Sequence, residues 1–185
     1  MSLDHILLGI LRSPASGYDI KAFFGENNFW HAELSQVYPA LNRLEGRGLL
    51  SSDTVASTSG PDRRVYHLTE SGSEELRTWL TGSPEIGVQK QPHLAQLFFM
   101  QELKDPERTI HFLTQLRALL TDRLAFLQKR ETELVSGGSW DYFEPETFHQ
   151  YAVLRYGLLS ASSNLAWCDE TIDRLKILID RNPQA

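Results

Sequence analysis

The sequence predicts a mainly α protein in two parts, a small α+β domain followed by an all-helical domain. In residues 1–80, short apolar segments are interrupted often by Gly, Pro, Ser and Asn, whereas residues 93–185 show long runs of helical periodicity. Between them, residues 81–92 read TGSPEIGVQKQP, which is the composition of a linker. We therefore expect one domain at 1–80, a linker at 81–92 and a second domain at 93–185.

Composition limits the class of protein. The 185 residues carry a net charge of −6, with 41% hydrophobic and 23% charged residues, which is ordinary for a folded chain and excludes a disordered or collagen-like one. The single cysteine, Cys168, excludes an intramolecular disulfide and a cysteine-based zinc site. The apolar stretches Ile6–Leu11 and Leu94–Met100 are too short to span a membrane. The first residues, Met-Ser-Leu-Asp, lack the basic region of a signal peptide, so we expect a cytoplasmic protein.

Two short helices are expected at the start of the first domain. Apolar residues at helical spacing predict a helix over 3–11, which ends at the Pro and Gly of residues 13–17. The second helix is expected from Tyr18 to Phe24, with Gly25 as its stop.

A third helix is predicted by the apolar spacing from Val37 to Leu44, and it ends at Gly46 or Gly48. Pro39 has no backbone donor, so the helix starts only a few residues before it. Ser35 is the candidate cap.

A two-stranded hairpin follows in the predicted first domain. Leu49–Ser57 reads as a strand, Ser-Thr-Ser-Gly-Pro-Asp as a turn, and Arg64–Leu68 as the antiparallel partner. Thr69 is the expected cap of a further helix that runs through Trp79. Three helices, a hairpin and another helix form the layout of a winged helix-turn-helix.

The second domain is predicted to be helical throughout. Helices are expected over His93–Leu103, over Pro106 to about Val135 and over about Pro145–Ile179, and the last two each carry one continuous apolar seam. Seams of that length usually pair with a partner chain, so this part is predicted to be a dimerisation module. The alternative is a helical hairpin within one chain.

The net charge alone does not indicate a nucleic-acid-binding protein. Residues 1–80 hold seven basic against ten acidic side chains, a net of −3, and the remainder holds eleven against fourteen, again −3. A DNA-binding domain usually shows a basic face. Few phosphates can then be neutralised, which predicts modest non-specific affinity for DNA.

A resemblance to a known family is carried by four segments in order: Gly17–Ile20, Phe29–Ala32, Ser35–Leu49 and the hairpin Gly60–Gly72. Together they resemble the DNA-binding domain of PadR-type transcriptional regulators and cover nearly all of residues 1–80. The remaining residues are similar in pattern to the longer C-terminal helical domain of one subgroup of that family. Glu33 departs from the family's usual small hydroxyl residue and places an acid near the start of the third helix.

The resemblance implies a homodimer that binds a roughly palindromic operator in double-stranded DNA, usually as a repressor. It also implies release by a small aromatic or otherwise hydrophobic effector. Two recognition helices would enter successive major grooves, and each hairpin wing would reach phosphates or the minor groove.

The expected DNA-binding residues lie on the second helix, the third helix and the wing. A tyrosine at position 38 faces DNA in similar proteins, and the start of the third helix suits phosphate oxygens, although Ser35 has capping as an alternative role. Neighbouring residues on a strand face opposite ways, so the sequence does not say which wing arginine contacts DNA. The full set is Tyr18, Lys21, Ser35, Gln36, Tyr38, Asn42, Arg43, Arg63 and Arg64.

Effector-binding residues are sought among the aromatic and polar side chains of the second domain. An aromatic-lined gap with a few polar groups suits a phenolic or planar ligand, although aromatic residues at helical spacing often serve only as core. The candidates are His93, Phe99, Trp140, Tyr151 and Trp167.

Other function classes have less support. The sequence has no HExxH, GxSxG, Walker or GxGxxG motif, so we expect no catalysis and no cofactor. A metal-responsive winged-helix regulator stays open as an alternative, although no two histidines are four residues apart and we predict no metal site. A winged helix that contacts proteins without binding DNA is the other alternative.

Overall fold

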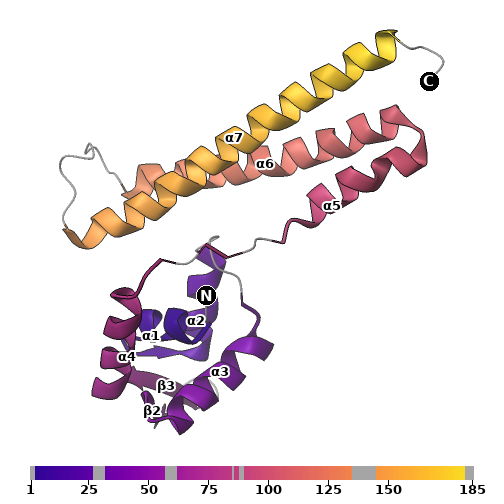
Figure 1. Ribbon diagram of the computed structural model, residues 1–185. Coiled ribbons are helices and arrows are strands. Elements are labelled where there is room, and N and C mark those ends of the chain that lie inside the picture. Colours follow the sequence, from indigo (N-terminus) through magenta and orange to yellow (C-terminus); the bar gives the residue numbers. More distant parts are fainter. Residues whose placement is uncertain are drawn as a thin grey trace. The chain divides into compact units, whose positions relative to one another are not determined.

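The chain forms two compact units, residues 1–88 and residues 89–185. The computed structural model describes residues 3–26, 32–56, 62–84, 86–87, 90–134 and 145–181. The first unit has a small sheet beside its helices, and the regular elements described in the second unit are all helices (Figure 1). This confirms the predicted fold class.

The first unit is a winged helix-turn-helix. Its elements are α1 (Leu3–Ile10), β1 (Ala15–Ser16), α2 (Gly17–Glu26), α3 (Leu34–Gly46), β2 (Leu50–Val55), β3 (Arg63–Leu68) and α4 (Glu70–Leu80). The three strands form an antiparallel sheet in the order β1-β3-β2. The wing hairpin pairs Leu50 with Leu68 at its base and Val55 with Arg63 toward its turn.

Several features of the first unit differ from the sequence predictions, among them an added strand and the end of α2. The two-residue strand β1 lies in the segment expected only to end the first helix, and it pairs Ala15 with Tyr66 of β3. Gly25 was expected to stop the second helix, but α2 continues through it to Glu26. A glycine in the last turn of a helix adopts helical angles at small cost, so it does not by itself end the helix.

Glu33, rather than Ser35, is the N-cap of α3, so the predicted cap is wrong. Glu33 has extended backbone angles, and the helix begins at Leu34. The backbone N–H of Glu33 donates to the side-chain oxygen of Gln36 over 3.1 Å, which satisfies a donor at the helix start. Ser35 lies inside the first turn and is exposed.

One core fills the first unit and fixes the orientation of α3. Its buried residues on α3 are Val37, Ala40, Leu41 and Leu44, which lie on one face and pack with buried residues of α1, α2, the sheet and α4. Burying one such aliphatic side chain contributes roughly 1.5–3 kcal/mol. The opposite face of α3 is therefore turned outward.

The start of α4 packs closely against the chain segment that follows α3. Thr69 caps α4 as predicted, because its hydroxyl oxygen accepts the N–H of Gly72 over 3.0 Å. The same hydroxyl donates to the carbonyl of Gly48 over 2.8 Å. A Cβ at position 72 would lie 2.1 Å from the carbonyl oxygen of Leu49, so only glycine permits this approach.

The second unit contains α5 (Pro92–Phe99), a 3₁₀ turn η1 (Met100–Leu103), α6 (Pro106–Leu134) and α7 (Pro145–Arg181). The helix expected over 93–103 is thus α-helical only to Phe99. The long helices α6 and α7 lie side by side (Figure 1).

The seams of α6 and α7 meet within one chain, as in the alternative of an intramolecular hairpin. Leu113 and Leu127 of α6 and Leu154 and Leu158 of α7 are buried. An ion pair between Arg117 and Asp169 joins the two helices. Other apolar side chains stay outside this contact, among them Leu119 and Leu159, which are 68% and 57% exposed. No helix in the described ranges is long and apolar enough to cross a membrane.

We predict that Gly72→Ala destabilises the first unit, because the new methyl group meets a backbone oxygen that cannot move without shifting the chain. Overpacking of this kind costs about 1–3 kcal/mol. Thermal unfolding followed by circular dichroism should show a lower midpoint for the unfolding of the first unit than in the wild type.

The matched control is Gly9→Ala in α1, where a Cβ meets nothing within 4 Å. Alanine is favoured over glycine in a helix by roughly 0.5–1 kcal/mol, so this variant is expected to be neutral or more stable. Equal midpoints for the two variants would contradict the close approach at Gly72.

Candidate DNA-binding surface

The outward face of α3 presents several of the predicted DNA-binding residues. Ser35, Pro39 and Asn42 lie opposite the buried face, at spacings of four and three residues, and all three are exposed. Tyr38 lies on one flank of this face and is 45% exposed. Arg43 lies on the other flank.

Tyr38 rests against the start of α2. A Cβ at Gly17 would lie 2.5 Å from the hydroxyl oxygen and 2.8 Å from ring carbons of Tyr38, so the ring occupies the space that a side chain at Gly17 would need. The neighbouring Tyr18 is 73% exposed, and Lys21, one turn further along α2, is also exposed. The contact between the Tyr38 ring and Gly17 therefore joins the outward face of α3 to the exposed side of α2.

Arg64 of the wing is tied to α3. Its Nε donates to the Ser52 hydroxyl over 2.8 Å, and its Nη2 donates to the Glu45 carboxylate. The Ser52 hydroxyl donates to the other Glu45 oxygen over 2.6 Å. The guanidinium also lies 5.2 Å from the ring centre of Tyr66. The Ser52 hydroxyl, and with it Arg64, lowers the pKa of Glu45, so this carboxylate is ionised at neutral pH.

Arg63 is paired with α2 instead. Its Nη2 lies 3.6 Å from a carboxylate oxygen of Asp19 and 3.4 Å from the Ser16 hydroxyl. Asp19 accepts the backbone N–H and the hydroxyl of Ser16 over 2.9 Å and 2.6 Å, and these bonds lower its pKa. Ser16 and Asp19 form a capping box at the start of α2, with the Ser-x-x-Asp spacing that could have been found in the sequence.

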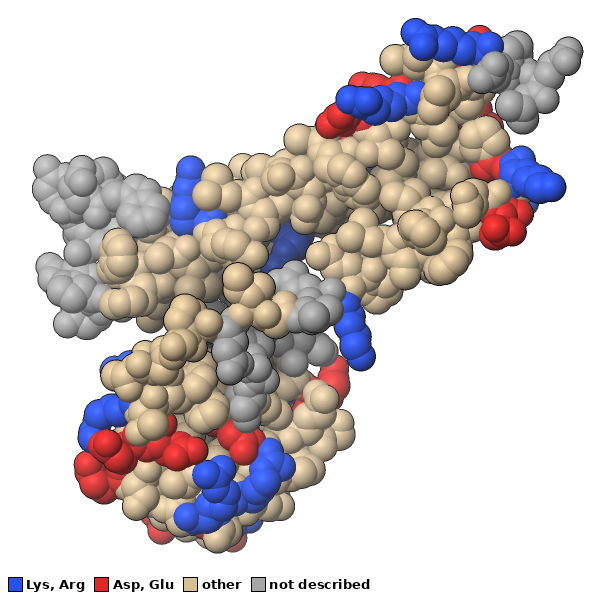
Figure 2. Space-filling view, in the orientation of Figure 1, with Lys and Arg blue, Asp and Glu red and all other residues tan. Residues whose placement is uncertain are grey.

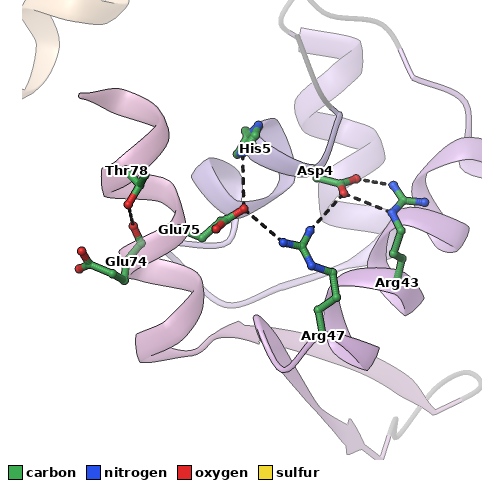
Figure 3. Close-up of polar contacts among 7 residues, drawn as sticks. All are labelled: Asp4, His5, Arg43, Arg47, Glu74, Glu75 and Thr78. Carbon is green, nitrogen blue, oxygen red and sulfur yellow. Dashed lines mark hydrogen bonds and ion pairs between the residues drawn. The ribbon is translucent and has the colours of Figure 1, made fainter. Parts of the chain in front are cut away.

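Arg43 points toward α1, where Asp4 accepts two of its hydrogen bonds, one of them from Nε over 3.2 Å (Figure 3). These bonds raise the pKa of Arg43. Asp4 also lies 3.9 Å from Arg47, which pairs with Glu75 of α4 over 3.2 Å. A chain of charges thus joins α1, α3 and α4 and holds Arg43 by its guanidinium.

Acidic groups accompany the arginines throughout this surface. Each arginine from Arg43 to Arg77 is paired with a carboxylate of the chain: Arg43 with Asp4, Arg47 with Glu75, Arg63 with Asp19, Arg64 with Glu45, and Arg77 with Glu70 and Glu74. Figure 2 shows acidic beside basic side chains on the first unit. Sequence reasoning identified Arg43, Arg63 and Arg64 as DNA-binding residues but missed the carboxylates that pair with them.

Two of the effector candidates, Tyr151 and Trp167, do not meet in one place within a single chain. Tyr151 and Trp167 are both on α7, and their separation of 167 − 151 = 16 positions corresponds to about 24 Å along a helix. Tyr151 is buried, and its hydroxyl donates to Glu131 over 3.1 Å. Phe99 is 62% exposed, and His93 and Trp167 are half-buried. Trp140 lies outside the described residues.

Cys168 lies next to Trp167 and is fully buried between the long helices. Burial raises the pKa of its thiol, which suits a packed side chain rather than a nucleophile. Among the residues that the structure describes, no three His, Cys, Asp or Glu side chains are grouped to hold a metal ion.

Comparison with known proteins covers both units. Residues 6–78 match the family described as "Transcriptional regulator PadR-like family", and residues 89–176 match the family described as "Virulence activator alpha C-term". The chain is 29% identical over 174 residues to "Negative transcriptional regulator PadR" of Bacillus subtilis, covering 92% of this chain and 95% of that protein.

Two solved structures of Bacillus subtilis PadR are similar to this chain over its length. The complex with operator DNA has a TM-score of 0.79, and the complex with p-coumaric acid has a TM-score of 0.75. Each is 28% identical, with 94% of this chain and 98% of the other covered. By these matches the chain combines a domain of the PadR-like family of transcriptional regulators, which are not enzymes, with a C-terminal helical domain of the virulence-activator type.

Proposed function

We propose that this regulator is a repressor that binds a palindromic operator as a homodimer and is released by a small aromatic effector. The observation that carries the proposal is the outward face of α3, which is held beside the wing by the core beneath it. Bacillus subtilis PadR, similar to this chain over nearly its whole length, is known in complex with operator DNA. The protein would act in the cytoplasm, where the chromosome is accessible.

The DNA contacts are divided between bases and phosphates. Tyr38 and Asn42 are exposed on α3 and would reach base edges in the major groove. The first turn of α3 would offer the backbone N–H and hydroxyl of Ser35 and the side-chain amide of Gln36 to phosphate oxygens, whereas the Gln36 backbone N–H already donates to the Glu33 carbonyl over 2.8 Å. The exposed Tyr18 and Lys21 of α2 and the two arginines at the wing would contact the backbone beside the groove.

Arg43 is a weaker candidate than its charge suggests. Its guanidinium is engaged by Asp4 on the flank of α3 that faces α1. A phosphate contact by Arg43 would have to replace this pairing.

We assign DNA binding to residues 1–80 and dimerisation to residues 93–185, with 81–92 as the linker. Apolar side chains that α6 and α7 do not bury within the chain are available for a second copy, Leu119 and Leu159 among them. Two copies would place two α3 helices in successive major grooves, one helical turn or a multiple of it apart.

The effector is assigned to the second domain with p-coumaric acid as the reference ligand, because Bacillus subtilis PadR is known in complex with it. Since Tyr151 and Trp167 are far apart on α7, one small effector would not contact both side chains of the same chain. Among the described candidates, Phe99 is exposed and Trp167 is half-buried, so both leave aromatic surface accessible.

Tyr38→Ala is expected to weaken binding to the preferred DNA by about 1–3 kcal/mol and to relax its sequence preference, as loss of a base contact does. Arg64→Ala is expected to weaken all sequences alike and to flatten the salt dependence, as loss of a phosphate contact does. The measurement is fluorescence anisotropy at two salt concentrations on three DNAs. These are the fragment upstream of the protein's own gene, a duplex selected by the protein from a random pool, and a scrambled duplex.

Arg77→Ala is the matched control, because Arg77 lies on α4, where its guanidinium pairs with Glu70 and Glu74 of the same helix. Its affinity for each DNA should equal that of the wild type. The wild type should prefer its selected duplex by about a thousandfold. Failure to enrich any duplex from the pool would contradict DNA-binding regulation by this chain.

The protein is expected to be a dimer of 2 × 21.1 = 42.2 kDa in light scattering coupled to size-exclusion chromatography. Leu159→Glu places a charge on apolar surface outside the hairpin contact and should shift the mass toward the monomer if that surface is the dimer interface. A wild-type mass of one chain at micromolar concentration would contradict the proposed dimer.

Addition of p-coumaric acid is expected to lower the affinity for the selected duplex by about 5–150-fold, the usual range of coupling between two sites. Trp167→Leu should require more acid for the same release while binding DNA normally without it. Cyclohexanecarboxylic acid, which has the carboxylate but no aromatic ring, is the control ligand. Equal release by both acids would contradict recognition of an aromatic effector.

A further inference from the structure

The two arginines at the wing are both neutralised by carboxylates that belong to other elements of the first unit. Asp19 of α2 faces Arg63, and Glu45 of α3 hydrogen-bonds Arg64. These pairs lie where the proposed function places DNA phosphates. The first unit thus has basic groups at the predicted contact sites without a net positive charge there.

Both carboxylates are held in place by neighbours that keep them ionised. The Ser16 backbone and hydroxyl fix Asp19, and the Ser52 hydroxyl fixes Glu45. Each carboxylate therefore presents a negative charge to its arginine in a position that is held by other hydrogen bonds.

The two pairs are also weak enough to exchange. The side chains of Arg63 and Arg64 are 54% and 48% exposed, and exposed ion pairs contribute only about 0–1 kcal/mol. A phosphate oxygen that comes close to either guanidinium can therefore replace its carboxylate at small cost. The replaced carboxylate then stays near the DNA and repels it.

We propose that Asp19 and Glu45 are specificity-determining residues, because they neutralise Arg63 and Arg64 and so suppress binding to random DNA. The two arginines exchange their carboxylates for phosphates only where base contacts hold the domain in register. The inference rests on the proposed DNA-binding function. On random sequence, few base contacts oppose the repulsion from the two acids. On the operator, the contacts made by α3 offset it.

The test uses Asp19→Asn and Glu45→Gln in the full-length protein, singly and together. Each amide keeps an acceptor oxygen for Ser16 or Ser52 but removes the negative charge that faces the arginine. The matched control is Glu74→Gln on α4, which removes the same charge from the same unit beside Arg77. Thermal unfolding shows whether each variant is folded before binding is compared.

Each amide variant is expected to bind a random-sequence 30-bp duplex about 3–10-fold more tightly than the Glu74→Gln control. The dependence of log K on log salt should steepen by up to about 0.9, because one further phosphate is neutralised without a competing acid. Binding to the duplex selected by the wild type should strengthen less, so the ratio of the two affinities falls.

Affinities for the random duplex equal to those of Glu74→Gln would overturn the inference, as would an unchanged affinity ratio. Either result, with a wild type that still prefers its selected duplex, leaves the proposed function in place. A wild type that enriches no duplex from the pool and binds no DNA would overturn the proposed function itself.

Discussion

The position of α3 depends on the burial of one of its faces, and the rest of the first unit depends on that position. Val37, Leu41 and Leu44 are fully buried, so the helix cannot rotate without exposing apolar surface. Pro39 lies on the opposite face of the helix. It has no N–H to donate to the carbonyl of Ser35, one turn earlier, and that carbonyl is near water. A proline in mid-helix is compatible with a recognition helix here because the interrupted hydrogen bond is on the outward side.

Ion pairs on the two flanks of α3 complete this placement. On one flank Asp4 of α1 binds Arg43, and on the other Arg64 of the wing binds Glu45. The core sets which face of the helix points outward, and these polar contacts set how the wing lies beside it. The wing is therefore fixed relative to α3 within the same unit, although only one side of its two strands is buried.

The helices and the wing could be predicted from the sequence because their signals are local. Apolar spacing defines the long helices, and Thr69 stands in the sequence where a cap is needed. The strand β1 has only two residues and no alternation, so it becomes visible only as the partner of β3. The cap of α3 was assigned to Ser35 by residue type, whereas the backbone angles at Glu33 decide it.

The candidate site was predictable in residue type but not in its pairings. Arg63 and Asp19 are 63 − 19 = 44 positions apart, so only the packing of the wing on α2 brings their charges together. The aromatic residues of the second domain show the same limit. Their types suggested a ligand site, but the continuity of α7 separates Tyr151 from Trp167.

The acidic balance of the first unit is consistent with DNA recognition once the pairings are considered. Most non-specific affinity for DNA comes from phosphate neutralisation, whereas sequence is read by contacts to the bases. Residues 1–80, with a net charge of −3, give up much of the first contribution and keep the second, which the proposed function assigns to the exposed face of α3. Dimerisation adds a second set of base contacts without adding net positive charge. Under the proposed function, such an acidic regulator gains occupancy of its operator chiefly through discrimination between sequences, while its affinity for the bulk of the chromosome stays low.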